Sequence, residues 1–293
     1  MTKDNFEQHR PRLFALAYKM LGSIHAAEDA VQDCWLRWQA SSQNDIRNQA
    51  AWLFTTTTRL CLDYLKSAKV QREQYVGPWL PEPLPSEHGE AAGSQPDDTA
   101  DIIELGQSLS YALLTLLERM PPKERAVFIL KEAFSFDHQE IANIIETRAD
   151  HSRKLLSRAR ARLHEENVEL QPSVEEHQEL FESFVLACGS GDLKQLLSLL
   201  AEDVQLVSDG GGVVRAALRP LNGKERLLRF FKRLQQQMEG SVDFSIKTIN
   251  AQPALWVAKN GAPYACICLE CYKGAISTIY IVRNPNKLAL KMS

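Results

Sequence analysis

The chain has 293 residues, of which 44% are hydrophobic, and its formal net charge at pH 7 is −3. The length predicts two or three domains, and the hydrophobic share suffices to fill their cores. A negative net charge excludes a protein whose whole surface coats nucleic acid, and no apolar run is long enough for a membrane span. Because no signal-peptide pattern is present either, we expect a cytoplasmic protein without membrane contacts.

Residues 1–76 are expected to form a helical domain. From Ala27 to Trp38 the apolar residues recur at the spacing of a helix with one buried face, and Ser23 is placed to cap its start. The opposite face of this helix carries Glu28, Asp29, Gln32 and Asp33. A second helix is predicted from about Gln49 to Val70. One of its polar stripes carries Arg59, Asp63, Lys66 and Lys69.

Residues 77–103 have the composition of a linker. They hold five of the thirteen prolines and six acidic residues but no lysine or arginine, and such a composition cannot build a core. The sequence WLPEPL, Trp79–Leu84, nevertheless places a large aromatic side chain and two leucines in this segment. A merely solvated tether has no need of them, so we expect this WLPEPL segment to dock on another part of the chain.

Residues 104–170 are predicted to be a second helical domain that ends in a helix-turn-helix. The pair Pro121–Pro122 starts one helix, and Asp137 and Glu140 have the spacing of a capping box at the start of the next. Six basic residues and one acidic residue lie between Thr147 and His164, mostly on the polar faces of the last helix. Such a helix fits the major groove of DNA. The alternative is a helix whose basic face is merely solvated.

Residues 173–293 differ from the preceding helical segments in the spacing of their apolar and polar residues. Two amphipathic helices, at about Val174–Cys188 and Asp192–Leu200, precede segments of alternating polarity. Examples of these segments are Val204–Val207, Val242–Ile249 and Tyr264–Tyr272. Helices followed by a run of strands predict a separate α+β domain.

The sequence SDGGG, Ser208–Gly212, matches no phosphate-binding loop. Its glycines predict a tight turn or bulge that needs positive φ angles. The functional alternative is a surface that contacts the linker or the first helical domain.

Three of the six cysteines, Cys266, Cys268 and Cys271, lie close together in the C-terminal part. A structural zinc site needs four ligands, and no histidine follows His177 to complete one. In an extended segment Cys266 and Cys268 share one face while Cys271 points the other way. We therefore expect strand packing here, and neither a metal nor a cofactor.

Several motifs resemble those of extracytoplasmic-function sigma factors. Leu13–Trp38 and AWLFTTTTRLCLDYLKS, Ala51–Ser67, resemble region 2 of that family. LERMPPKERAVFILKEAF, HQEIANII and LLSRARARL resemble its region 4. WLPEPL, SDGGG and NPNKL, Asn284–Leu288, resemble the subgroup with a C-terminal SnoaL-like domain, which has no conventional membrane-bound anti-sigma partner and is modulated in cis.

This resemblance implies a multidomain fold and a function. The expected fold has two all-α sigma domains, region 2 at 1–76 and the region 4 helix-turn-helix at 104–170. They are joined by the linker at 77–103 and followed by an α+β SnoaL-like cone-shaped barrel at 173–293. The implied function is to bind core RNA polymerase, through its β′ clamp helices and β flap, and to direct transcription from particular promoters. The implied DNA partners are promoter double-stranded DNA and the melted −10 strand.

Site residues follow from the resemblance by matching position. The expected polymerase-binding residues are Glu28, Asp29, Gln32, Asp33 and Arg37. Those expected to bind the −10 element, with the segment Ser41–Asn48 capturing a flipped base, are Asp45, Arg47, Asn48, Arg59, Lys66 and Lys69. Those expected at the −35 element are Arg148, Arg153, Lys154, Arg158 and Arg160. The expected regulatory contacts involve Trp79, Leu80, Leu84, Asp209, Gly210, Gly211, Gly212, Asn284, Pro285, Lys287 and Leu288.

The chain departs from the family pattern at two positions of the helix-turn-helix. Glu146 stands where a turn glycine is common, and Ser152 stands where an apolar residue is common. These departures leave the start of the recognition helix, and hence its base-contacting residues, open. The promoter sequence and the inducing signal are also left open.

Two rival functions are weighed against the sigma factor. An isomerase- or cyclase-like SnoaL-like enzyme fused to a DNA-binding module needs a desolvated acid or base. The candidate polar groups for it are Asp209, Glu270, Tyr264 and Tyr272. Since no paired carboxylates or His–Asp constellation is visible, we expect no enzyme, and whether the C-terminal domain takes a small ligand is left open. A repressor with one helix-turn-helix would leave the region 2 motifs without a role.

Overall fold

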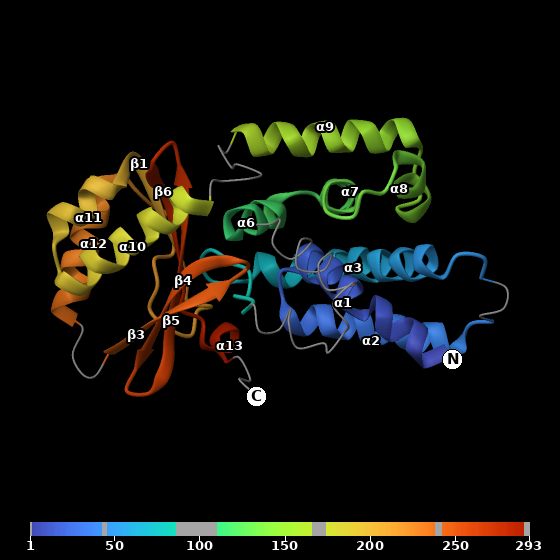
Figure 1. Cartoon of the computed structure of the whole chain (residues 1–293), viewed down its shortest axis with the longest axis horizontal. Helices are drawn as coiled ribbons and strands as arrows, with labels where there is room; N and C mark the ends of the chain where they lie inside the picture. Colours follow the sequence, from blue (N-terminus) through green and yellow to red (C-terminus); the bar gives the residue numbers. More distant parts are fainter. Residues whose placement is uncertain (1, 43–45, 86–109, 166–173, 238–241, 290–293) are drawn as a thin grey trace. The chain divides into compact units, whose positions relative to one another are not determined.

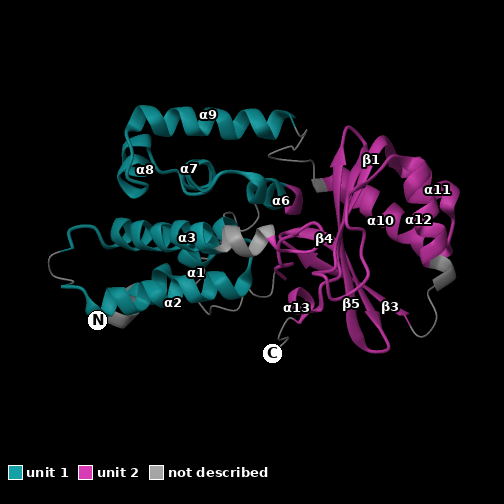
Figure 2. Ribbon diagram, turned by 180° about the vertical axis from the view of Figure 1, so that it is seen from behind, with its two compact units in different colours: residues 1–73, 87–109, 113–168 teal, residues 74–86, 110–112, 169–293 magenta. Residues whose placement is uncertain are grey.

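The computed structural model describes residues 2–42, 46–85, 110–165, 174–237 and 242–289 (Figure 1). The chain forms two compact units (Figure 2). Unit 1 consists of residues 1–73, 87–109 and 113–168, and unit 2 of residues 74–86, 110–112 and 169–293. No helix in the described ranges has both the length and the apolar character needed to cross a bilayer.

Unit 1 begins with a bundle of three helices. These are α1 (Thr2–Leu21), α2 (Ile24–Ala40) and α3 (Gln49–Glu73). Ser23 caps α2 as predicted, because its side chain accepts a hydrogen bond from the backbone N–H of Ala26 at 3.3 Å. The apolar stripe of α2 is buried against the other helices, and its fully enclosed members include Ala27, Cys34 and Trp38. The helices predicted for this part of the chain are therefore present, and the polar face of α2 is left to solvent.

The next four helices are α6 (Tyr111–Arg119), α7 (Pro122–Glu132), α8 (His138–Ile144) and α9 (Ala149–Glu165). Pro122 occupies the first turn of α7, where its missing N–H costs nothing. The predicted capping box of α8 is confirmed: Asp137 accepts from the backbone of Gln139 and Glu140, and Glu140 accepts from the backbone N–H of Asp137. Local hydrogen bonds thus set where these helices begin.

The two sets of helices contact each other within unit 1. The guanidinium of Arg125 in α7 is buried, donates to the carbonyl of Met20 in α1 and pairs with Glu118 at 2.8 Å. The ring centroid of Phe54 in α3 lies 5.2 Å from that of Phe134, which follows α7. A buried charged group that keeps a carboxylate partner holds such a contact in one geometry.

Unit 2 combines four helices with one six-stranded sheet. The helices are α10 (Val174–Ser190), α11 (Leu193–Leu199), α12 (Lys224–Gln237) and α13 (Pro285–Leu288). The strands are β1 (Leu200–Asp209), β2 (Leu221–Asn222), β3 (Val242–Ile249), β4 (Gln252–Lys259), β5 (Ala262–Tyr272) and β6 (Ala275–Val282). Their order is β2-β1-β6-β5-β4-β3, with β1 parallel to β6 and the other pairs antiparallel. The predicted fold class, helices in the N-terminal part and an α+β arrangement in the C-terminal part, is confirmed.

The two faces of this sheet bury different partners. One face packs with α10 and α12 into a core that includes Phe181, Phe184, Leu227 and Leu269. Residues of the opposite parity, such as Tyr280, point to the other face. There Tyr280 packs against Tyr111 at 5.5 Å between ring centroids. The sheet is therefore a single layer. Helices cover one of its faces, and residues 74–86 and 110–112 of the same unit pack against the other.

The predicted orientation of the three neighbouring cysteines is confirmed. Cys266 and Cys268 share one face of β5, with sulfur atoms 3.9 Å apart, and Cys271 belongs to the core on the opposite face. Within the described ranges no group of three histidine, cysteine or acidic side chains is arranged to hold a metal. The NPNKL motif, Asn284–Leu288, follows β6 and forms the one-turn helix α13, which Asn284 caps by accepting from the N–H of Asn286 at 3.1 Å.

Candidate functional site

The polar face of α2 carries the residues expected to bind polymerase. All of them are exposed, and they alternate along α2 with the buried positions of its apolar stripe. They are Glu28, Asp29, Gln32, Asp33 and Arg37. Since their side chains are not needed for packing, they are free to serve recognition, and charge changes among them should leave the fold intact.

The residues expected at the −10 element lie around the start and along the side of α3. Arg47 and Asn48 are exposed, and the Asn48 side chain caps α3 by accepting from the N–H of Ala51 at 3.0 Å. Lys66 is exposed and pairs with Asp63 at 2.7 Å. Asp45 and the side chain of Lys69 lie outside the described residues.

Arg59 differs from the other expected −10 residues because its partners lie on a helix far away in the sequence. It donates to the carbonyls of Ile144 and Asn143, at 3.1 and 3.2 Å, and pairs with Glu146 at 3.2 Å. These groups form the C-terminal end of α8, where unsatisfied carbonyls favour a cation. Arg59 therefore connects α3 to the turn of the helix-turn-helix.

A hollow of about 390 Å³ lies beside Arg59 on the surface of region 2. Its walls include two guanidinium groups, the indole of Trp52 and two threonine side chains. They are Arg37, Trp52, Thr55, Thr56 and Arg59. The ring centroid of the Trp52 indole also lies 5.4 Å from that of Trp38, so Trp52 packs in the helical bundle and borders the hollow as well.

The basic residues of α9 lie on its exposed faces, but most have carboxylate partners. Arg153 pairs with Asp150 at 2.7 Å, and Arg160 pairs with Glu132 at 2.7 Å. Arg158, at 3.9 Å, and Arg162, at 3.3 Å, both approach Glu124. Arg162 was not among the expected site residues, although it belongs to the same basic run. The remaining two expected residues, Arg148 and Lys154, are exposed as well.

The two departures from the family pattern have local explanations. Glu146 has a φ of 53°, the left-handed conformation that a turn glycine supplies without strain. Ser152 is fully buried, and its hydroxyl lies 2.9 Å from Nδ1 of His138, which links the start of α8 to α9. The recognition helix therefore begins at Ala149, directly after the strained turn.

A buried hydrogen-bond network in unit 2 receives the linker. We call it the Asp209 cluster: Tyr75, Leu80, Asp209, Asn284 and Lys287. The Asp209 carboxylate accepts from the Tyr75 hydroxyl at 2.6 Å, the Leu80 N–H at 2.9 Å and the Lys287 ammonium at 2.8 Å. The Asn284 amide donates to the Tyr75 oxygen at 2.9 Å. Asp209 is 0% exposed, so each of these bonds acts in a medium of low polarity.

Lys287 is the cation of the Asp209 cluster. Besides Asp209, its ammonium donates to the Leu80 carbonyl at 2.5 Å and lies 3.8 Å from the centroid of the Trp79 indole. A cation over an indole face gains electrostatic energy that grows as water is excluded. Burial and the hydrogen bond to Asp209 raise the pKa of Tyr75 above its usual range. The phenol therefore stays protonated and remains a donor.

The glycine turn after Asp209 needs its glycines for two reasons. Gly211 and Gly212 have φ angles of 62° and 74°, as the turn prediction required. A Cβ at Gly211 would come within 2.3 Å of the Asn284 amide, and one at Gly212 would come within 3.1 Å of Val76. Gly210 likewise leaves no room for a Cβ. The turn is thus also a contact surface for the residues that precede WLPEPL.

The rest of the linker is held by backbone pairing. Leu84 exchanges hydrogen bonds with Asn250, donating its N–H to the side-chain oxygen at 3.2 Å and accepting from the N–H of Asn250 at 2.8 Å. The Pro81 carbonyl accepts from the Tyr111 hydroxyl at 2.6 Å. Tyr75 and Tyr111 were missed from sequence. Of the expected contacts, Leu288 is buried, whereas Pro285 is exposed.

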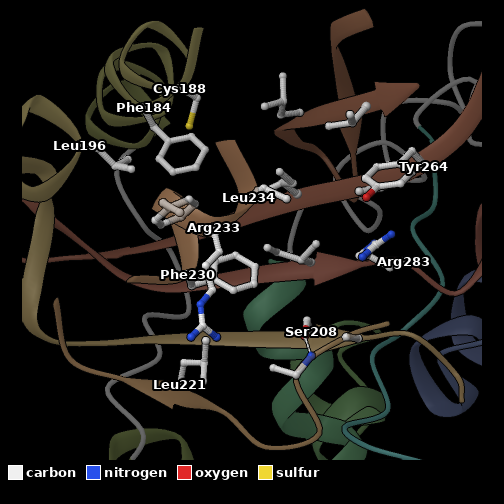
Figure 3. Close-up of a pocket in the computed structure, with 18 of the residues that line it drawn as sticks. Phe184, Cys188, Leu196, Ser208, Leu221, Phe230, Arg233, Leu234, Tyr264 and Arg283 are labelled. Atoms are coloured by element: carbon white, nitrogen blue, oxygen red, sulfur yellow. Dashed lines mark hydrogen bonds between the residues drawn. The ribbon is translucent and has the colours of Figure 1, made fainter. Parts of the chain in front are cut away.

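A large pocket opens on the helix-covered side of the sheet in unit 2 (Figure 3). Its volume is about 920 Å³. Of the four polar groups named for the rival enzyme, only Tyr264 lines it. Asp209 does not line it, because alternate residues of β1 point to opposite faces and its carboxylate is bonded to the linker.

Comparisons with known proteins follow the same division of the chain. The family described as Sigma-70 region 2 matches residues 6–70, and the one described as Sigma-70, region 4 matches residues 110–163. The extracytoplasmic-function RNA polymerase sigma factor SigJ of Mycobacterium tuberculosis is 34% identical over 243 residues, 81% of this chain and 74% of that protein. The probable sigma factor SigI of that organism is 32% identical over 282 residues, covering 96% and 92%. The crystal structure of SigJ matches 97% of both chains at 28% identity, with a TM-score of 0.76.

Proposed function

The chain belongs to the extracytoplasmic-function family of RNA polymerase sigma factors, as its motifs predicted, and we propose from this premise how it works. It binds core RNA polymerase in the cytoplasm and directs it to particular promoters, with control in cis by the C-terminal domain. Residues 1–76 act as region 2, 77–103 as the linker, 104–170 as region 4 and 173–293 as the regulatory domain.

The polar face of α2 is the proposed docking surface for the polymerase β′ clamp helices. Its five residues are exposed and project from one side of a helix whose other side is buried. The β flap is the proposed partner of region 4. This assignment is supported by the family match of residues 6–70 to region 2 and of 110–163 to region 4.

Promoter contact is proposed for two basic surfaces. Arg47, Asn48, Arg59 and Lys66 would bind the −10 strand, and the exposed face of α9 would enter the −35 major groove. The guanidinium of Arg59 already serves Ile144, Asn143 and Glu146, which leaves part of its five N–H donors for a DNA phosphate. Binding of the −10 strand by Arg59 would therefore compete with its hold on the end of α8.

The single observation that carries the proposal of control in cis is the Asp209 cluster. It holds residues that lie, in sequence, between region 2 and region 4. It does so through a buried carboxylate that is one of the four candidate acid or base groups of the rival enzyme. A domain that binds the linker influences how far apart the two DNA-binding regions can move. We propose a regulatory domain here and no catalysis.

Run-off transcription with core polymerase on a promoter library tests the proposal. The full chain should direct initiation from a subset of promoters, and a chain that ends before residue 173 should lose or deregulate this activity. Initiation by core polymerase that is unchanged by the protein would overturn the sigma assignment.

A charge reversal separates polymerase docking from promoter binding. Asp29→Arg together with Asp33→Arg should abolish pull-down of core polymerase while thermal unfolding stays as in the parent, because both side chains are exposed. Glu7→Arg on α1, another exposed acidic position, is the matched control and should bind core polymerase normally. Unchanged pull-down by the double variant would show that this face does not dock.

A further inference from the structure

The pocket of unit 2 has the size and walls of a ligand site. Its volume of about 920 Å³ lies in the range that holds drug-sized molecules. Most of its surface is aliphatic or aromatic and comes from α10, α12 and the sheet, for example Phe184, Leu221, Phe230 and Leu234 (Figure 3). An apolar molecule in this pocket would gain by leaving water, at about 25 cal/mol for each Å² of apolar surface buried.

The charged residues known to line the same pocket are all of one sign. Five arginines line it, and no aspartate or glutamate among the described residues does. They are Arg215, Arg226, Arg229, Arg233 and Arg283. Three of the five follow each other at helical spacing on α12, so they share one side of that helix. For all five, the described parts of the chain supply no carboxylate within ion-pair distance, in contrast to four of the arginines on α9.

Arg283 is held in a way that leaves a donor unused. Its guanidinium lies 4.3 Å from the centroid of the Tyr264 ring and donates to the carbonyl of Arg215 at 2.6 Å. Its Nε is buried and has no hydrogen-bond acceptor among the described residues. A buried N–H without an acceptor costs free energy, which an acceptor on a ligand would recover.

We propose that this pocket binds an amphipathic anion, a molecule with an apolar body and one carboxylate or phosphate group. The apolar body occupies the space between α10, α12 and the sheet. The anionic group lies among the arginines, where it neutralises like charges that otherwise repel one another and accepts from Arg283. A neutral molecule of the same shape gains only the apolar part of this interaction.

The pocket and the Asp209 cluster are separated by a single layer of sheet. Ser208 and Arg283 line the pocket, and their chain neighbours Asp209 and Asn284 point to the linker side. The backbone N–H groups of Arg283 and Asn284 both donate to the Asp209 carbonyl, at 2.7 and 2.9 Å. A ligand that shifts Arg283 therefore shifts the cluster that holds the linker. This second part rests on the proposed control in cis.

Fluorescence of cis-parinaric acid, itself an amphipathic carboxylate, measures binding to the full-length protein without polymerase. Dodecanoate should displace the probe, whereas dodecanol should need about tenfold higher concentration or more, which corresponds to ~1.4 kcal/mol. Dodecyl phosphate distinguishes a preference for phosphate from one for carboxylate. Equal displacement by dodecanoate, dodecanol and dodecylamine would overturn the proposal, because charge would then play no part.

Variants locate the site. Arg233→Met combined with Arg283→Met should weaken probe binding about tenfold or more, and Ala217→Trp, which fills the pocket from its wall, should abolish it. Arg219→Met is the matched control, since Arg219 is exposed on the same domain but does not line the pocket. Parent-like binding by the double variant and by Ala217→Trp would show that the probe binds elsewhere.

Reciprocal linkage tests the coupling separately. If the ligand changes how tightly the linker docks, then docking changes the probe affinity in return, and Trp79→Ala, which weakens docking, should shift that affinity by about threefold or more. An unchanged affinity would overturn the coupling while leaving the site in place. Neither result depends on transcription, so failure here is distinct from failure of the sigma assignment.

Discussion

The two units present their candidate functional groups in opposite ways. In unit 1 the acidic face of α2 and the basic face of α9 are exposed helix surfaces, and each residue is placed by its own helix. In unit 2 the Asp209 cluster is buried and combines residues from positions 75–80, 209 and 284–287. Each exposed charge contributes little free energy to binding, and salt screens its interactions. A buried network, in contrast, loses much of its stability when one member is removed. Four sets of substitutions would break or sharpen this contrast.

The largest effect is expected from Asp209→Ala. Removal of the carboxylate leaves the Lys287 ammonium and the Leu80 N–H buried without their acceptor, which costs about 3–5 kcal/mol. Limited proteolysis should then cut the WLPEPL segment faster, and unit 2 should unfold at lower temperature. Asp209→Asn, which keeps one acceptor oxygen, is the milder control. A parent-like cleavage rate for Asp209→Ala would mean that the cluster does not hold the linker.

The second effect concerns Lys19, a buried lysine within unit 1. Burial lowers the pKa of Lys19 from 10.5 to about 7. Between these values the unfolded chain holds a proton that the folded chain has lost, so the free energy of unfolding rises as pH rises from about 7 to about 10. One pKa unit corresponds to about 1.4 kcal/mol, so the rise amounts to several kcal/mol.

Urea unfolding of the parent and of Lys19→Met at several pH values measures the Lys19 effect. The substitution should remove most of this slope and stabilise unit 1 most at pH 7 and below, where the parent carries a buried charge. Lys66→Met, at an exposed lysine on α3, is the control and should leave the slope as in the parent. An equal slope in Lys19→Met and the parent would show that Lys19 does not titrate in this range.

A smaller effect is expected on α9. Arg153→Ala should cost about 1–3 kcal/mol of binding to the preferred promoter, and relax sequence preference, if Arg153 reads a base. Lys154→Ala should instead weaken binding to all sequences equally and reduce the salt dependence, as loss of a phosphate contact does. Electrophoretic mobility shifts at several salt concentrations on matched and mutated −35 sites separate the two outcomes. No change in either variant would count against α9 as the reading helix.

The smallest effect is expected at Glu146. A left-handed φ of 53° at a residue with a Cβ lowers the free energy of unfolding by about 1–2 kcal/mol. The exposed ion pair with Arg59 raises it by about 0–1 kcal/mol. Glu146→Gly should therefore stabilise unit 1 slightly, and Glu146→Ala, which keeps the strain and loses the ion pair, should not. Thermal unfolding of the three proteins decides this. A destabilised Glu146→Gly would show that the ion pair outweighs the strain.

The elements of unit 1 could be predicted because their signals are local. The apolar stripe of α2, the Ser23 cap, the capping box of Asp137 and Glu140, and the exposed faces of α2 and α9 all depend on residues within a few positions of one another. A helix repeats its own hydrogen bonds every turn, so a short window of sequence contains most of what determines it.

The contacts that define the linker site of unit 2 join residues that lie far apart in the sequence. WLPEPL was expected to dock because an indole and two leucines are costly to leave in water, and its contact near Asp209 was expected from the family resemblance rather than from any local pattern. Tyr75, whose hydroxyl joins Asp209 to Asn284, and Tyr111, which holds the Pro81 carbonyl, carry no distinguishing sequence signal.

The sequence by itself determined the main helices of unit 1, the α+β character of unit 2, the charge of the exposed faces of α2 and α9, and the family to which the chain belongs. Only the tertiary structure decided that Arg59 holds the end of α8, that Asp209 faces the linker rather than the pocket, and that five arginines surround an apolar cavity. Each of these depends on contacts between residues that are tens to hundreds of positions apart in the sequence. Such contacts form when whole faces of helices and sheets pack together, and no short stretch of the chain contains that information.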